Sequence, residues 1–398
     1  MIAFGLTEDQ LEYQRMARQF IAQNVTPNAG HWDETGHFPK DEIRSAWENG
    51  LLNLCIPESV GGAGMPLVDT LIISEEISYG CVGYSTSCMA NELALTPVVI
   101  GADEDQKRKF LKPFVDEFKL AAFCLSEPGA GSDAASLRTT AKREGDEWVI
   151  NGQKQWITNA THADFYTVFA TVDREAGHRG ITLFAVPRNT PGITIAPHEN
   201  KMGQRCSDTA PISFDNVRVP ADHCIGGPGN GWKIAMRTLD FSRPLVAMSA
   251  VGVARRALEE SIKYAKERKT FGKPIGQHQA IGFMLSDMAA KTQAARLLAL
   301  EAAWRTDQGL PANKEASFAK AMCADWCMEI CTDAVQIFGG YGYTKEYPVE
   351  KLMRDAKLIQ IYEGTSQIQR VVISRELMLS LTISCHLADA SSHTPTPP

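Results

Sequence analysis

The chain has 398 residues, of which 44% are hydrophobic and 22% are charged. This length is enough for two or three domains with substantial cores. With 40 basic and 47 acidic residues the net charge is −7, which gives no sign of a nucleic-acid partner. No apolar run reaches the length of about 18 residues that a membrane span requires, so we expect none.

The N-terminal region, residues 1–118, has the sequence pattern of a helical domain. Thr7 and Gln10 have the spacing of a capping box, which predicts a helix that starts near Thr7. Helical periods follow at 42–52, 68–77 and 104–115, interrupted by glycine and proline. The apolar stretch 83–95 contains many small residues and is typical either of a core helix or of the wall of a ligand tunnel.

The pattern changes near residue 119, and residues 119–231 read as a β domain. β-branched and aromatic residues alternate over 165–171, 181–186, 193–196 and 210–219. The pair Asn151-Gly152, flanked by Trp148 and Trp156, predicts a hairpin turn. Because no long helix intervenes, we expect an antiparallel β-barrel or sandwich.

Residues 232–380 return to long helical periods and are predicted to form a helical bundle, and the polar, proline-rich segment 381–398 reads as a disordered tail. Cys323, Cys327 and Cys331 share one helical face, which favours a packing stripe over a metal site because metal ligands normally converge from several directions. The ten cysteines have no disulfide or metal framework, a usage that fits a reducing compartment.

The most informative stretch runs from Met353 to Arg370 and contains Glu363 between two helical patterns, next to Gly364. Two readings of Glu363 are open. It could be a surface residue that starts a helix. It could also be a base placed where the chain turns inward and backbone N–H groups are free.

Two stretches of the β domain carry ligand-type residues. In 123–133, Gly129 and Gly131 allow a close backbone approach and two serines offer hydroxyl groups, although the third glycine of a dinucleotide fingerprint is missing. In Trp156-Ile157-Thr158, the indole is either a core side chain or a surface for stacking on a flat ring.

Three further stretches lie in the helical bundle. The segment 268–272, followed by His278 and Gln279, is either a helix C-terminus capped by Gly272 or a contact to a phosphate and a ring. The stretch 240–244 reads as a turn before a helix, with Asp240 and Arg243 as a local ion pair. The glycines within 336–343 are typical of a helix terminus and would also let the backbone touch a ligand.

Taken together, these stretches make the chain resemble the acyl-CoA dehydrogenase family, over about residues 5–378. The motifs that carry the resemblance are LSEPGAGSD, QWITNA, MGQRCSDT, ERKTFGKPI, QIFGGYGY, YPVEKLMRDAK and IYEGTSQIQR. The branch that it resembles acts on short and medium straight-chain acyl-CoA. The resemblance implies an α+β fold with an α-helical N-terminal domain, a β middle domain and a C-terminal four-helix bundle.

The resemblance also implies FAD as cofactor and removal of two hydrogens from an acyl-CoA thioester. Glu363 would take the α-proton while a hydride leaves the β-carbon for flavin N5, and the electrons would pass to an electron-transfer flavoprotein. The family alternatives are an acyl-CoA oxidase that uses O₂, which is usually longer, and a non-catalytic assembly protein, which would not need Glu363.

Site residues follow from the motifs, residue by residue. The expected FAD contacts are Phe123, Leu125, Ser126, Gly131, Ser132, Trp156, Ile157, Thr158, Arg268, Thr270, Phe271, His278, Gln279, Gln336, Gly339, Gly340, Thr365 and Gln367. The expected substrate contacts are Met89, Ser132, Asp240, Arg243, Tyr362, Glu363 and Gly364. No metal is expected.

Several of the flavin contacts, from Arg268 to Gly340, would reach FAD across a subunit boundary, which implies a homotetramer built as a dimer of dimers. Met89 stands where medium-chain relatives typically carry a glutamate, which leaves the acyl length open. The N-terminus has neither a basic region before an apolar core nor the composition of a transit peptide. We therefore expect a bacterial-type cytoplasmic enzyme, or a mitochondrial matrix enzyme if a transit peptide is missing.

Overall fold

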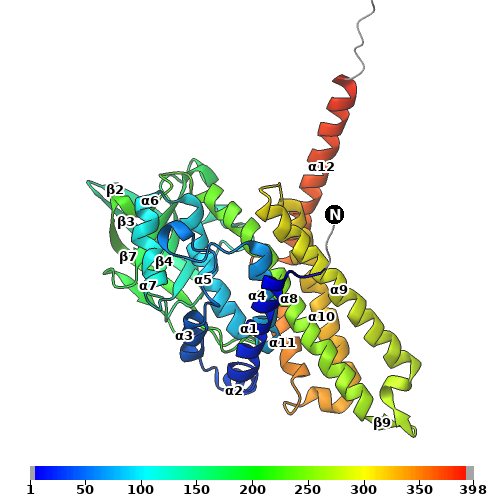
Figure 1. Cartoon of the computed structure of the whole chain (residues 1–398). Helices are drawn as coiled ribbons and strands as arrows, with labels where there is room; N and C mark the ends of the chain where they lie inside the picture. Colours follow the sequence, from blue (N-terminus) through cyan, green and yellow to red (C-terminus); the bar gives the residue numbers. More distant parts are fainter. Residues whose placement is uncertain (1–4, 391–398) are drawn as a thin grey trace, which may run out of the picture.

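The computed structural model describes the backbone of residues 5–390 and the side chains of residues 5–379. The N-terminal part is helical, and its elements are α1 Glu8–Asn24, α2 Ala29–Thr35, α3 Lys40–Glu48, α4 Leu67–Gly80, α5 Val82–Gly101, α6 Glu104–Phe110 and α7 Lys112–Asp116, with a short 3₁₀ turn η1 at Glu58–Val60. Helices α1 and α4 lie beside the bundle, and α6 and α7 lie beside the strands of the middle domain (Figure 1).

Two local predictions in this part are confirmed. The Thr7 side chain accepts from the backbone N–H of Gln10, and the Gln10 side chain accepts in return from the N–H of Thr7, so α1 begins with a capping box. The stretch 83–95 lies within α5, where nearly every side chain is buried. Burial on all sides explains why its sequence shows no polar face.

The middle domain contains an eight-stranded sheet with the order β6-β7-β3-β2-β4-β5-β8, and β1 pairs with β4. Most neighbours are antiparallel, but β1 and β2 pair with β4 in parallel, so the sheet is mixed and not purely antiparallel. The strands are β1 Ala121–Cys124, β2 Thr140–Glu144, β3 Glu147–Thr158, β4 Phe165–Thr171, β5 Ile181–Pro187, β6 Ile193–Ile195, β7 Thr209–Pro220 and β8 Cys224–Ile225.

The hairpin predicted at Asn151-Gly152 is wrong, because both residues lie inside the continuous strand β3. The turn stands earlier, where Gly145 has a φ of 60° between β2 and β3. Gly152 is needed for a different reason: a Cβ there would lie 2.4 Å from the Thr139 hydroxyl oxygen. A glycine is therefore needed inside β3, where the backbone of Thr139 comes close and the register against β7 shifts. In the sequence this glycine has the same appearance as a turn glycine.

The C-terminal part is a bundle of long helices, with α10 packed against α8, α9 and α12. Its elements are α8 Gly231–Glu267, β9 Lys269–Thr270, β10 Lys273–Pro274, α9 Gln279–Asp307, α10 Asn313–Phe338, α11 Val349–Ile359 and α12 Ser366–Ala390. Since α12 runs to Ala390, residues 381–390 are helical and not the disordered tail that we predicted; residues 391–398 lie outside the described part. Cys323, Cys327 and Cys331 are buried in the bundle core, as a packing stripe requires.

In the bundle, one turn prediction and one of the two open interpretations of segment 268–272 need correction. The stretch 240–244 lies inside α8, not before it, and Pro244 is accommodated in the helix interior. An interior proline costs about 3 kcal/mol, which burial of the following Leu245 and Val246 in the bundle core offsets. Gly272 does not cap α8; together with Phe271 it forms the two-residue turn of the β9–β10 hairpin.

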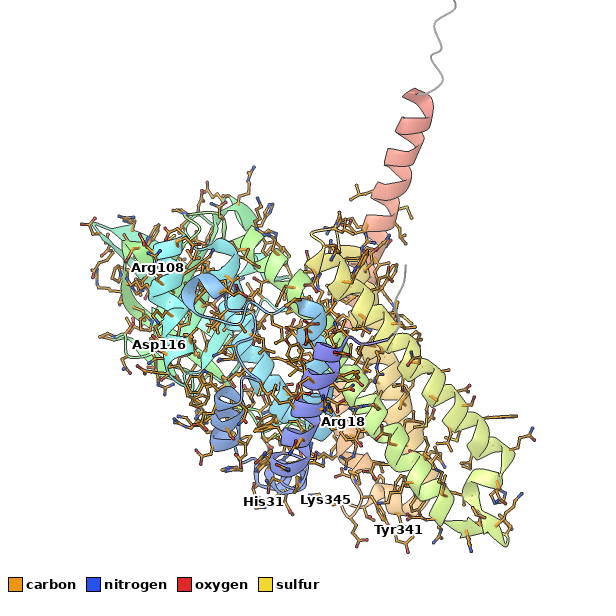
Figure 2. All side chains as sticks on the ribbon, in the orientation of Figure 1. Arg18, His31, Arg108, Asp116, Tyr341 and Lys345 are labelled. Carbon is orange, nitrogen blue, oxygen red and sulfur yellow. The ribbon has the colours of Figure 1, made fainter. Side chains whose placement is uncertain are left out.

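Ion pairs join the helical N-terminal part to the bundle. Glu75 and Glu76 of α4 are almost fully buried, and both bind Arg255 of α8. Arg18, labelled on α1 in Figure 2, adds a 2.8 Å contact to Glu76, and Arg296 of α9 binds Glu75. Three positive charges therefore neutralise two buried carboxylates, and removing one partner would leave a buried charge uncompensated.

A second buried ion pair fixes the loop after β1. Lys154 of β3 is fully buried, and its Nζ lies 2.8 Å from Glu127 Oε1 and 3.0 Å from the Leu125 carbonyl oxygen. Glu127 also accepts from the backbone N–H groups of Arg138 and Thr139. The pair thus ties the segment that contains Ser126 to the sheet.

We expect Lys154→Met to lower the free energy of unfolding of the β domain by about 3–5 kcal/mol, because Glu127 would remain buried without a counter-charge. Urea titration followed by circular dichroism measures the change. Lys142→Met, on the exposed side of β2, is the matched control and should stay within about 0.5 kcal/mol of the parent. Equal midpoints for the two variants would contradict a stabilising role of the pair.

Candidate active site

Glu363 lies in the turn that joins α11 to α12. Its φ of 52° is left-handed, which is uncommon for a residue other than glycine, and Gly364 follows with a φ of 87°. A Cβ on Gly364 would lie 2.6 Å from Gln369 Nε2, so this position needs glycine. Strained backbone of this kind costs about 1–3 kcal/mol and concentrates at functional sites.

Two side chains hold this turn. Lys320 Nζ of α10 donates to the Gly364 carbonyl oxygen at 2.6 Å. Gln369 Nε2 of α12 donates to the carbonyl oxygens of Glu363 and Gly364 at 3.2 and 3.1 Å. Because both carbonyls point to these donors, the left-handed conformation is supported from two helices.

The Glu363 carboxylate is partly buried and faces α8. Ser242 Oγ donates to its Oε2 at 2.5 Å. Burial raises the pKa of Glu363, while the Ser242 hydrogen bond and the charges of Lys320 and Arg243 act in the opposite direction, and the pKa stays above its usual value. A raised pKa brings a carboxylate closer to the range in which a general base works best.

Lys320 is fully buried, and desolvation lowers its pKa to about 8 although Glu363 and Asp325 favour its charged form. Our sequence reading missed Lys320, Ser242 and Gln369. A signal for Lys320 was present, because this single cation occupies the same helical face as Ala316, Ala319 and Cys323.

Asp240 and Arg243 form the predicted local ion pair, with Arg243 Nη1 2.8 Å from Asp240 Oδ1. Arg243 is buried, and desolvation lowers its pKa while Asp240 and Glu363 raise it. Arg243 of this pair therefore lies close enough to the Glu363 carboxylate for the two charges to interact. Tyr362 packs against the bundle core, and burial raises the pKa of its hydroxyl.

Met89 of α5 is buried close to the same part of α8. Its sulfur lies 3.1 Å from Ser249 Oγ, and it lines a small cavity of about 20 Å³ together with Leu245 and residues of α4. Ser242, which binds Glu363, and Leu245 are one helical turn apart on α8. Met89, which is expected to influence the acyl length, and Glu363, the candidate base, therefore both contact side chains of α8.

The β-domain candidates divide into core and surface residues. Leu125 and Ile157 are buried, and the half-buried Phe123 packs on Phe169 with ring centroids 5.1 Å apart, so all three side chains contribute to the core. Trp156, in contrast, is 61% exposed and has a φ of 62°.

Trp156 and Ser126 are neighbours, because the N–H of Gln155 donates to the Ser126 carbonyl at 2.9 Å. Within the described side chains, the hydroxyls of Ser126 and Thr158 have no hydrogen-bond partner. Gly129, Gly131 and Ser132 lie in the exposed loop that follows, where open space surrounds both glycines. Among the described atoms, the surface therefore combines the Trp156 indole, two hydroxyl groups without a partner and two glycines with no atoms close to them. Such a surface suits a flat polar ring.

The remaining predicted contacts lie elsewhere. The β9–β10 hairpin is at the far tip of the bundle from the sheet (Figure 1), and its Phe271 is 97% exposed with a φ of 50°. Tyr264 stacks on Phe338 at 4.1 Å and Arg268 lies 5.6 Å from the Tyr341 ring, so the hairpin and the turn after α10 form one surface. That surface holds Arg268, Thr270, Phe271, His278, Gln279, Gln336, Gly339 and Gly340.

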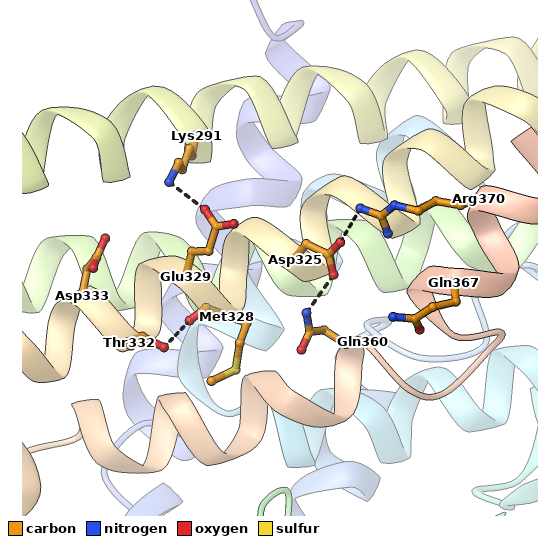
Figure 3. A pocket seen from close by; sticks show the side chains of 9 residues that line it. All are labelled: Lys291, Asp325, Met328, Glu329, Thr332, Asp333, Gln360, Gln367 and Arg370. Atoms are coloured by element: carbon orange, nitrogen blue, oxygen red, sulfur yellow. Dashed lines mark hydrogen bonds and ion pairs between the residues drawn. The ribbon is translucent and has the colours of Figure 1, made fainter.

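Within a single chain, this surface lies far from β3, which carries Trp156 (Figure 1). Thr365 and Gln367 make a third group at the start of α12, where Thr365 Oγ1 accepts from the N–H of Ile368. Gln367 is exposed and lines a surface groove of about 660 Å³, where Asp325 binds Gln360 and Arg370 (Figure 3).

These separate groups of side chains could contact an extended ligand such as a flavin nucleotide. Exposed Trp156 with the half-buried Ser126 and Thr158 could hold a ring, and the glutamine amides and the Thr365 turn could bind polar groups. Among the residues that the structure describes, no group of three His, Cys, Asp or Glu side chains could hold a metal ion. None of the described helices is long and apolar enough to cross a membrane.

Comparison with known proteins shows which family the chain belongs to. Three family models match the chain: acyl-CoA dehydrogenase N-terminal domain over 7–117, middle domain over 122–217 and C-terminal domain over 229–378. A probable medium-chain specific acyl-CoA dehydrogenase 2, mitochondrial, of Caenorhabditis briggsae is 44% identical over 95% of this chain and 92% of its own.

Solved structures agree as well. Butyryl-CoA dehydrogenase from Megasphaera elsdenii is 39% identical, with a TM-score of 0.92 over 95% of this chain and 100% of its own. A chain in the structure of the electron transferring flavoprotein of Acidaminococcus fermentans is 42% identical, with a TM-score of 0.92 over 94% and 99%. Both the predicted family and the predicted three-part fold are confirmed, and the chain belongs to the acyl-CoA dehydrogenases, a family of FAD-dependent oxidoreductases.

Proposed function

We propose that this protein oxidises a short or medium straight-chain acyl-CoA to its trans-2-enoyl-CoA, with Glu363 as the base that removes the α-proton. The observation that carries the proposal is the Glu363 carboxylate itself. It lies on a left-handed turn with a raised pKa, and it is oriented by Ser242 at 2.5 Å. FAD, when bound, supplies the acceptor for the hydride that leaves the β-carbon.

Only one carboxylate oxygen is held by Ser242, which leaves Glu363 Oε1 free to take a proton. As the α-proton leaves, negative charge develops on the thioester carbonyl oxygen and needs preorganised donors. In the described part of the chain, the backbone N–H groups of Glu363 and Gly364 donate no hydrogen bond, so they suit this role. Lys320 and Gln369 keep the N–H groups in place by holding the carbonyl oxygens of the same turn.

For the other components we propose the family arrangement. Ser126, Trp156, Thr158, Thr365 and Gln367 would contact FAD from one subunit. The exposed surface around Phe271 would contact FAD from a second subunit, which supports a dimer of dimers. The likeness to a chain from an electron transferring flavoprotein structure supports such a flavoprotein as electron acceptor. Slow reoxidation of the reduced protein by air, and fast reoxidation by that partner, would separate this proposal from an oxidase.

We expect Glu363→Gln to lower the rate of flavin reduction by at least about 100-fold while FAD stays bound, because the amide cannot accept the α-proton. Anaerobic stopped-flow bleaching of the flavin by butyryl-CoA and octanoyl-CoA measures the rate. Glu301→Gln, at an exposed position of α9, is the control and should behave as the parent. Reduction by Glu363→Gln at the parent rate would remove this residue from the role of base.

Lys320→Met should shift the pH dependence of flavin reduction. The base works only when ionised, so activity is lost as the pH falls through the raised pKa of Glu363. Lys320 stabilises the ionised form, and its removal should raise that pKa further and move the acidic limb of kcat/KM to higher pH. Lys357→Met, with an exposed lysine on α11, should leave the limb in place. A limb that does not move in Lys320→Met would show that this cation does not act on the base.

Met89→Ala should move the substrate preference toward longer acyl chains, because the truncated side chain would enlarge the cavity between α4, α5 and α8. The measurement is a series of flavin reduction rates from butyryl-CoA to dodecanoyl-CoA. Met288→Ala removes another buried methionine, from α9, and serves as the control for lost packing. The same length profile in both variants would place the end of the acyl site elsewhere.

A further inference from the structure

Two cysteines are in contact at the boundary between the helical N-terminal domain and the β domain. Cys81 lies between α4 and α5, and Cys206 lies in the loop between β6 and β7. Their sulfur atoms are 3.8 Å apart, and the two residues are 2% and 1% exposed.

The surroundings of Cys81 favour its thiolate. The hydrogen bond from Cys206 and the charge of Lys351, whose Nζ lies 3.5 Å from Cys81 Sγ, lower the pKa of Cys81 below its usual value against the opposing effect of burial. Lys351 is itself buried and paired with Asp355 at 2.5 Å. Burial instead raises the pKa of Cys124 and Cys323. Since the thiolate is the reactive form of cysteine, Cys81 is activated and these two are not.

The loop that carries Cys206 is fixed on both sides. The Gln204 N–H donates to the Asp355 carboxylate, and Gln204 Oε1 accepts from Thr86 Oγ1 at 2.7 Å. Gly83 leaves room for the sulfur, because a Cβ there would lie 2.7 Å from Cys206 Sγ. The fold therefore holds the two sulfur atoms in contact. A disulfide forms when their separation falls from 3.8 Å to the bond length of about 2.05 Å.

We propose that Cys81 and Cys206 form an oxidation site at which hydrogen peroxide converts the two thiols into a disulfide between the helical N-terminal domain and the β domain. The oxidant has to be small, because both sulfur atoms are buried. Cys81 sulfur attacks one peroxide oxygen, the O–O bond breaks, and a sulfenic acid forms as the hydroxide leaves and is protonated. Cys206 sulfur then attacks Cys81 sulfur, the S–O bond breaks, and water leaves. Two thiols lose two electrons and peroxide is reduced to two waters.

The test uses the full-length protein with FAD bound. It is treated with hydrogen peroxide, denatured, alkylated with iodoacetamide, digested without reductant and analysed by mass spectrometry. We expect a linked pair of peptides that contain Cys81 and Cys206, and we expect dithiothreitol to reverse the link. In Cys206→Ser the link should be absent and dimedone should label Cys81, because the sulfenic acid has no thiol to attack it. Cys331→Ser, which alters a buried cysteine of α10, should form the link as the parent does.

The proposal is overturned if Cys81 and Cys206 of the parent protein are both alkylated after peroxide treatment. It is equally overturned if both are oxidised separately to sulfinic acid without a link. These readouts come from the parent protein, so they decide the matter even if a serine variant fails to fold. They also do not depend on acyl-CoA turnover, which keeps them separate from the test of Glu363.

Discussion

The desolvated carboxylate of Glu363 is the constraint on which the rest of the site depends. A partly buried carboxylate needs donors and cations close by, and here they come from α8 and α10, through Ser242, Arg243 and Lys320. These helices can supply them only because they pack against each other along the bundle. The left-handed turn would relax without the donors to its carbonyl oxygens. The packing of the bundle thus determines both the position and the pKa of the Glu363 side chain.

Helix α8 lies between the Glu363 turn and the helical N-terminal part, so residues from more than one domain surround the candidate base. Its Ser242 faces Glu363, while Leu245 and Ser249 meet Met89 of α5, so the helical N-terminal part closes the space beside the base. The β domain offers the exposed Trp156 and free hydroxyls on a separate surface. The ion pairs of Glu75 and Glu76 keep α4 against the bundle, and any acyl site between α5 and α8 inherits that fixed geometry.

The sequence was sufficient for the order of the domains, the capping of α1 and the place of Glu363 between two helices. It misled where one residue type serves two purposes. Gly152 resembled a hairpin residue but is required by the approach of Thr139, and the stretch 240–244 resembled a turn before a helix but lies within α8. It was silent on Ser242 and Lys320, because their role depends on the packing of distant helices, which no local period encodes.

Three buried lysines show a common principle in this chain. Lys154 binds the loop beside Ser126, Lys320 binds the turn of Glu363, and Lys351 binds the thiol of Cys81. Burying an ammonium group costs several kcal/mol unless a carboxylate or several oxygens face it. Lys154 and Lys351 each have a carboxylate within 3 Å, whereas Lys320 has only the Gly364 carbonyl as its hydrogen-bond partner and lies near Glu363. Lys320 is therefore the least compensated of the three, which accounts for its pKa of about 8 and makes its charge the one most sensitive to what occupies the site.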